Sequence, residues 1–129
     1  MANQFGHLTI LVRDYDEAIR FYTILGMEVL VDNMFGDDLR WVSMAFPTSV
    51  AFKIVLQKAV TDKEKQAVGK QAGDNCFLTV ETDNCVAEYE RLRGKGVYFF
   101  GEPSTVPWGV EAVFEDLYGN LLDLVQIRP

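Results

Sequence analysis

Hydrophobic and polar positions along the chain repeat at a fixed interval. The segments FGHLTILVRDYDEAIRFYTILGMEVL and NCFLTVETDNCVAEYERLRGKGVYFF carry the same order of apolar, β-branched and glycine positions. His7 falls on Phe77 and Gly26 falls on Gly96, a shift of 70 residues in both cases (77 − 7 and 96 − 26). The interval continues to the end of the chain without a gap. The pattern therefore predicts two copies of one structural unit.

The first copy predicts one strand, one helix and three further strands. Asp14 or Asp16 can cap the helix, Ala18 and Tyr22 belong to its apolar stripe, and Gly26 ends it. Alternating apolar and β-branched residues predict strands over 6–12, 27–32, 40–46 and 50–57.

The second copy repeats that order. Asp83 or Asn84 can cap a helix over about 84–94, which Gly96 ends. Tyr118-Gly119-Asn120 is typical of a hairpin turn. Strands are predicted over 76–82, 97–101, 110–115 and 121–127.

Length and composition predict a single domain over residues 1–129 with a substantial core, since 49% of the residues are hydrophobic. Module one covers 4–57, a polar linker covers 58–74 and module two covers 75–127. The linker is expected to be partly helical or a mobile flap.

This organisation predicts an α+β fold of two tandem β-α-β-β-β modules, which form a curved mixed sheet around a cleft. A helix covers one face of each four-stranded sheet, and the other face must be buried against something else. Strand alternation turns His7, Thr9, Phe77 and Thr79 towards that cleft. The candidate ligand-binding residues are His7, Thr9, Trp41, Lys53, Phe77, Thr79, Trp108, Glu111 and Asp123.

The formal net charge of −7 argues against nucleic acid, because phosphate binding needs a basic face, and it could favour a cationic ligand. Cys76 and Cys85 match no zinc motif and are expected to be reduced and structural. No apolar stretch approaches the roughly 20 residues that span a bilayer, and the N-terminus does not resemble a signal peptide. We expect a cytoplasmic protein with no membrane partner.

Three segments carry a family resemblance: HLTILVRDYDEAIRFYTILGMEVL, VAEYERLRGKGV and PWGVEAVFEDLYGNLLDLVQ. They resemble the vicinal oxygen chelate superfamily, which includes glyoxalase I, bleomycin resistance proteins, fosfomycin resistance proteins and extradiol dioxygenases. The ending keeps Asp116, Gly119 and Asn120, whereas Leu117-Tyr118 replaces the usual proline-aspartate. The resemblance covers nearly the whole chain and implies the fold, but the superfamily hosts many chemistries.

The resemblance also implies four metal-ligand positions, which fall on His7, Lys53, Phe77 and Asp123. Enzymes of the superfamily carry histidine or glutamine at the two first-strand positions and glutamate at the two last-strand positions. Only His7 and Asp123 can ligate a cation here. We hypothesise that the Lys53 ammonium group replaces the charge of the metal and pairs with Asp123.

The first functional interpretation is a metal-free binding protein that sequesters a small organic molecule, in the manner of bleomycin resistance proteins. It needs no cofactor and, by analogy with the superfamily, forms a homodimer. The alternative is a divalent-metal-dependent lyase, isomerase or dioxygenase, with Glu111 or Glu115 as a further ligand. A third interpretation is acid–base catalysis by His7 and Asp123, with Lys53 stabilising an oxyanion.

Overall fold

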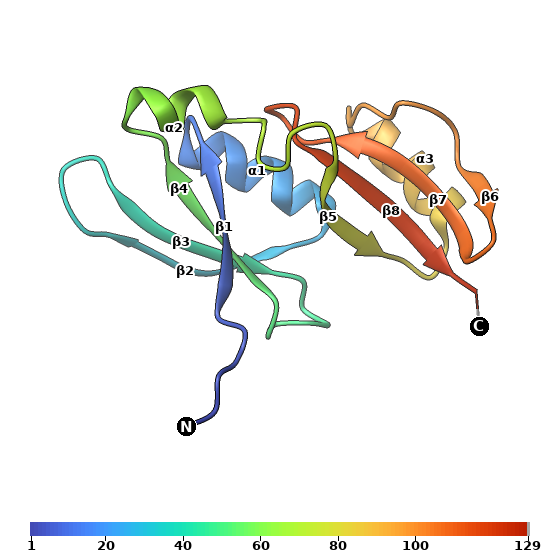
Figure 1. Cartoon of the computed structure of the whole chain (residues 1–129), viewed down its shortest axis with the longest axis horizontal. Coiled ribbons are helices and arrows are strands. Elements are labelled where there is room, and N and C mark those ends of the chain that lie inside the picture. The colour runs from blue at the N-terminus through green and yellow to red at the C-terminus, as the bar shows by residue number, and fades with distance from the viewer. Residues whose placement is uncertain (129) are drawn as a thin grey trace. The chain divides into compact units, whose positions relative to one another are not determined.

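The computed structural model describes residues 1–128 (Figure 1). The chain divides into two units, one over Met1–Val68 and one that begins at Gly69. The boundary lies within the predicted linker 58–74. Within residues 1–128, no helix is long and apolar enough to cross a membrane.

The first unit contains a four-stranded mixed sheet with the order β1-β4-β3-β2. Strand β1 runs parallel to β4, and the other neighbours are antiparallel. The elements are β1 (His7–Val12), α1 (Tyr15–Leu25), β2 (Glu28–Met34), β3 (Arg40–Ala45), β4 (Lys53–Lys58) and α2 (Asp62–Ala67).

Helix α1 begins and ends where the sequence predicts. The Asp14 carboxylate accepts a hydrogen bond from the Glu17 backbone N–H at 2.8 Å, and Gly26 takes a left-handed conformation with φ of 119°. Four side chains on one face of the helix are buried against the sheet: Tyr15, Ala18, Tyr22 and Leu25. This face and the α1-facing strand residues form the core of the unit.

The second unit repeats this arrangement, with the strand order β5-β8-β7-β6. Strand β5 is parallel to β8, and Asn84 caps the helix through the Ala87 backbone N–H at 3.1 Å. The elements are β5 (Cys76–Glu81), α3 (Cys85–Gly94), β6 (Ser104–Val106), β7 (Gly109–Glu115) and β8 (Leu121–Ile127). The predicted β-α-β-β-β modules are therefore confirmed.

The turn between β7 and β8 is held by a buried carboxylate. Asp116 accepts hydrogen bonds at 2.9 Å from the backbone N–H groups of Tyr118 and Asn120 and from the Asn120 side-chain amide. The Asn120 side-chain oxygen accepts from the Gln71 backbone N–H at 3.0 Å. The predicted hairpin turn is confirmed, and it fixes the end of the linker within the second unit.

The predicted strand over 97–101 is wrong. Tyr98 and Phe100 each make one backbone hydrogen bond to β7, but the pairing stops there and β6 begins only at Ser104. Gly101 ends the segment and Pro103 follows it. Because proline has no N–H group to donate to a ladder, the pairing does not continue directly into β6.

The predicted strand 50–57 begins later, at Lys53, because the chain before it forms tight turns. The Ser49 N–H donates to the Phe46 carbonyl and the Phe52 N–H donates to the Ser49 carbonyl, both at 3.0 Å. Phe52, which alternation would place in the core, is 65% exposed.

The prediction of one constant shift is correct for the first and third strands but wrong for the last. Thr9 lies opposite Val55, and Thr79 lies opposite Asp123, so the shift is 70 in the first strand (79 − 9) but 68 in the last (123 − 55). Seven residues, 46–52, connect β3 to β4, whereas five, 116–120, connect β7 to β8. This shorter turn accounts for the difference, and Lys53 and Asp123 do not occupy equivalent ladder positions.

Candidate ligand-binding site

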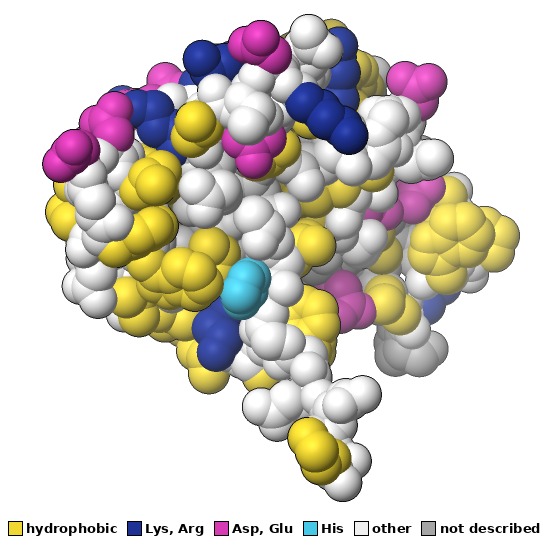
Figure 2. All heavy atoms as spheres, turned by 60° about the vertical axis from the view of Figure 1, so that its left-hand side comes forward, with side chains coloured by type: hydrophobic (Ala, Val, Ile, Leu, Met, Phe, Trp, Pro, Cys, Tyr) yellow, Lys and Arg dark blue, Asp and Glu magenta, His cyan; other side chains and the backbone are white. Residues whose placement is uncertain are grey.

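The face of the first sheet that points away from α1 contains a hollow of about 320 Å³. Hydrophobic side chains gather over this side of the molecule (Figure 2). The lining residues are Gly6, His7, Leu30, Val31, Trp41, Ser43, Lys53 and Val55. Three of the predicted site residues, His7, Trp41 and Lys53, are thus brought together in one unit.

The strand ladder explains how these side chains meet. Val31, Ser43, Val55 and Thr9 lie opposite one another on successive strands, so their side chains share one face. Val55 and Ser43 are 3% and 4% exposed and form the floor of the hollow.

The β2–β3 ladder is irregular between Val29 and Val31. A β-bulge interrupts simple alternation and re-aims side chains. Leu30 therefore joins Val31 in lining the hollow, and periodicity alone could not have found it. Gly6 was also missed, because alternation within the predicted strand 6–12 turns it to the opposite side from His7.

The aromatic part of the hollow consists of His7 and Trp41. Their ring centroids are 5.5 Å apart with an interplanar angle of 86°, an edge-to-face contact. Trp41 is 41% exposed, which leaves part of the indole surface open to solvent. An open indole next to aliphatic side chains suits a flat organic ligand.

The cation of the hollow is Lys53, which is half-buried and lies opposite His7 on the neighbouring strand. Two other basic side chains of the first unit have acidic partners. Arg40 pairs with Asp16 at 2.9 Å and with Asp32 at 2.7 Å, and Lys58 pairs with Asp38 at 3.4 Å. Among the described residues of this unit, no carboxylate lies within 4.0 Å of the Lys53 ammonium group.

The corresponding face of the second sheet is acidic. The Thr79 hydroxyl donates a hydrogen bond of 2.6 Å to the Asp123 carboxylate, and Val113 lies opposite Asp123 on the other side. Desolvation, together with the charges of Asp123 and Glu111, raises the pKa of the Cys76 thiol. Within the second unit, Thr79 and Asp123 therefore contact each other, and the charges of Asp123 and Glu111 act on the same thiol.

The other two predicted residues of this unit lie elsewhere in it. Phe77 is half-buried at the irregularity of the β5–β8 ladder. Trp108 is 55% exposed in the turn between β6 and β7, where its carbonyl accepts from the Arg128 N–H at 2.9 Å.

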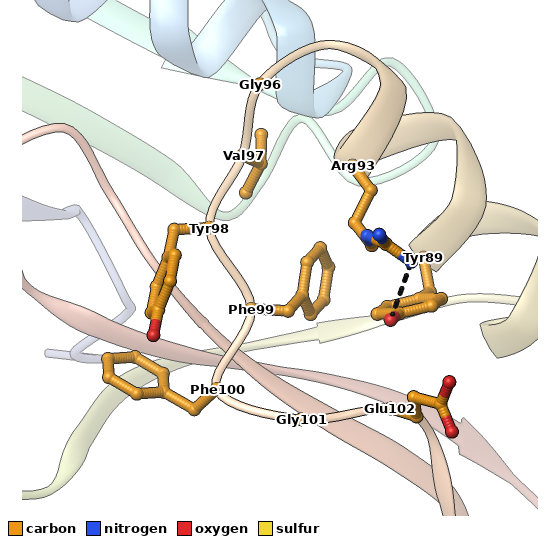
Figure 3. A pocket seen from close by; sticks show the side chains of 9 residues that line it. All are labelled: Tyr89, Arg93, Gly96, Val97, Tyr98, Phe99, Phe100, Gly101 and Glu102. Atoms are coloured by element: carbon orange, nitrogen blue, oxygen red, sulfur yellow. Dashed lines mark hydrogen bonds between the residues drawn. The ribbon is translucent and has the colours of Figure 1, made fainter.

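A larger hollow of about 540 Å³ lies beside helix α3 in the second unit. Figure 3 shows Phe99 pointing towards Tyr89, while Tyr98 and Phe100 project from the opposite side of the segment. Arg93 donates to the Tyr89 hydroxyl at 3.1 Å, and Tyr98 and Phe100 are 60% and 54% exposed. Residues 97–101, which surround this hollow, were predicted as a strand, so the hollow could not be predicted from the sequence.

Comparison with known proteins places this geometry in a family. The family model described as the glyoxalase/bleomycin resistance protein/dioxygenase superfamily matches residues 4–124. The chain belongs to this superfamily. An uncharacterised protein of Shewanella frigidimarina is 37% identical over 130 residues, which cover 99% of this chain and 96% of that protein.

Two solved structures share the fold over almost the whole chain. The structure of UcmS2 is 35% identical with a TM-score of 0.83 and covers 97% of this chain and 98% of its own. TnmS3, an antibiotic binding protein from Streptomyces sp. CB03234, is 28% identical with a TM-score of 0.80 and covers 99% of both chains.

The superfamily's metal positions, as carried over by resemblance, have an unfavourable donor set in this chain. On the strand next to His7, Lys53 brings an ammonium group, and Phe77 has no lone pair to donate. Within residues 1–128, no group of three or more histidine, cysteine, aspartate or glutamate side chains is arranged to hold a metal ion. A lone imidazole beside an ammonium group does not fit a divalent cation.

Proposed function

We propose that this superfamily member binds a small, flat organic molecule in the hollow of the first sheet and needs no divalent metal to do so. The observation that carries the proposal is the exposed indole of Trp41, held edge-to-face against His7 over a floor of Val55 and Ser43. Binding covers the open aromatic surface and removes it from water, which is favourable.

The size of the hollow supports this assignment. Its volume of about 320 Å³ lies at the lower end of the range of small-molecule sites, about 300–1,000 Å³. The similarity to TnmS3, described as an antibiotic binding protein, supports a sequestering role. The contacts predicted for the second unit, Phe77, Thr79, Trp108, Glu111 and Asp123, stay a prediction, as do the homodimer and the Lys53–Asp123 pair.

Titration with acridine-9-carboxamide, an uncharged flat probe, tests the proposal. We expect saturable binding by calorimetry, and Trp41→Ala should weaken it at least about tenfold because the main aromatic contact is lost. Phe35→Ala is the matched control, since Phe35 is 51% exposed but does not line the hollow.

Fluorescence locates the probe. The Trp108→Phe variant leaves Trp41 as the only tryptophan of the chain, so quenching of its emission reports contact in the hollow. If the probe binds with equal affinity to the wild type and the Trp41→Ala variant, the hollow of the first sheet is not the site. If no flat probe binds at all, the binding function itself is wrong.

A further inference from the structure

The hollow of the first sheet carries a positive charge, although the chain as a whole has a formal net charge of −7. Lys53 supplies that charge, and among residues 1–128 no acidic side chain lines the hollow with it. A half-buried ammonium group without a carboxylate partner in its own unit has lost part of its hydration. A ligand that supplies an anionic oxygen would restore that interaction.

The strand register fixes where the anion would lie relative to the ring-binding surface. Lys53 is the direct cross-strand neighbour of His7, and the His7 ring meets Trp41 at 5.5 Å. The cation and the open indole are therefore both neighbours of one imidazole. A flat ligand that covers Trp41 can place a substituent of its ring next to the ammonium group.

We propose that the ligand is an aromatic molecule with an anionic oxygen, such as a carboxylate, phenolate or sulfonate, and that Lys53 is its counter-ion. This inference rests on the proposed function, because it assigns the charge of the ligand of that same hollow. Charge-assisted hydrogen bonds are roughly twice as strong as neutral ones and gain further in a partly desolvated site.

The net charge of the whole chain could favour a cationic ligand, but the charge of the hollow does not. None of the acidic side chains among residues 1–128 lines the hollow. In the first unit, Asp16, Asp32 and Asp38 pair with Arg40 and Lys58. The local charge of the hollow, rather than the net charge, decides which group it stabilises at short range.

Three probes with one ring system test the charge assignment: acridine-9-carboxylate, acridine-9-carboxamide and 9-aminoacridine. We expect the wild-type protein to bind the carboxylate about tenfold more tightly than the amide in calorimetry at low salt, and the cationic amine least tightly. The Lys53→Gln variant should lose that preference, and Lys53→Arg should keep it because the charge remains.

Lys58→Gln is the matched control. Lys58 lies on the same strand, β4, but pairs with Asp38 and does not line the hollow. Thermal midpoints confirm that each variant is folded.

The outcomes separate the two proposals. Equal affinity for all three probes in the wild type, or an unchanged carboxylate preference in Lys53→Gln, overturns the anionic ligand while leaving the binding function intact. Failure of all three probes to bind contradicts the proposed function itself.

Discussion

The two cysteines of the second unit have different surroundings. Cys85 is fully buried, and its thiol donates to the Leu124 carbonyl at 3.6 Å. Cys76 is exposed, and desolvation followed by the charges of Asp123 and Glu111 raises its pKa. The two thiols should therefore differ in reactivity through access, and that of Cys76 should depend on nearby carboxylates.

A thiol-reactive disulfide reagent should label one cysteine of the native protein, Cys76, and both after unfolding. Asp123→Asn should speed the labelling of Cys76 near pH 8, because loss of the negative charge lowers the thiol pKa and more thiolate is present. Labelling is followed by absorbance. Glu88→Gln is the control, since Glu88 pairs with Arg91 and does not act on Cys76. Equal rates in all three proteins would contradict the assigned influence of Asp123.

At the residue scale, alternation was sufficient to place His7, Trp41 and Lys53 on one face of the first sheet. It could not find Leu30, because a bulge breaks the two-residue period. It also could not tell that Asp123 lies opposite Thr79, since register depends on the length of the connecting turn.

At the scale of elements, Gly109 limits what the start of β7 can tolerate. Its φ is 154°, and an added Cβ atom would lie 1.9 Å from the Gln126 carbonyl oxygen on β8. No side chain fits between these two backbones, so β8 would have to move away from β7. The close approach of two strands therefore requires glycine here.

Gly109→Ala should lower the free energy of unfolding by about 2–4 kcal/mol, measured by urea denaturation. Gly94→Ala is the comparison, because Gly94 is the last residue of α3 and an added Cβ would meet nothing within 4 Å. That substitution should be neutral or stabilise by up to about 1 kcal/mol. A Gly109→Ala protein as stable as the wild type would show that the two strands are not this close.

Element positions were predicted best where a cap and a stop residue frame the segment. Asp14 and Gly26 frame α1, and the turn at Gly119 sets the start of β8. The segment 97–101 has the apolar character of a strand but lies between interruptions at Gly96 and Gly101. The apolar composition of a short segment does not show whether the flanking residues allow it to form continuous hydrogen bonds with an adjacent strand.

At the scale of the whole molecule, the two modules share their strand order and differ in their charged groups. The sequence repeat predicted the shared order of elements along the chain, because matched hydrophobic positions indicate matched elements, and the two sheets have the same strand order. The repeat also implied that Lys53 and Asp123 occupy equivalent positions, which is wrong. The β7–β8 turn is two residues shorter than the β3–β4 connection and moves Asp123 out of register with Lys53. The superfamily fold was therefore predictable, whereas the pairing of its site positions was not.

Metal content separates the proposed function from the enzymatic alternative. We expect elemental analysis of the purified protein to find well below one equivalent of any transition metal, because His7 lies beside the Lys53 ammonium group. Added nickel, zinc, iron or manganese should leave the thermal midpoint unchanged. Lys53→Glu supplies a carboxylate at this position and serves as the comparison. Stoichiometric metal in the wild type would favour a lyase, isomerase or dioxygenase.

The buried turn of Asp116 and Asn120 has a consequence for how the second unit folds. It joins β7 and β8 through five residues, whereas the parallel partners Thr79 and Asp123 are 44 residues apart (123 − 79). Closing the longer loop costs more chain entropy, and the short hairpin can gain its hydrogen bonds first. We therefore expect the β7–β8 hairpin to form first during folding of this unit. Strand β5 would then pair with β8 in a later step.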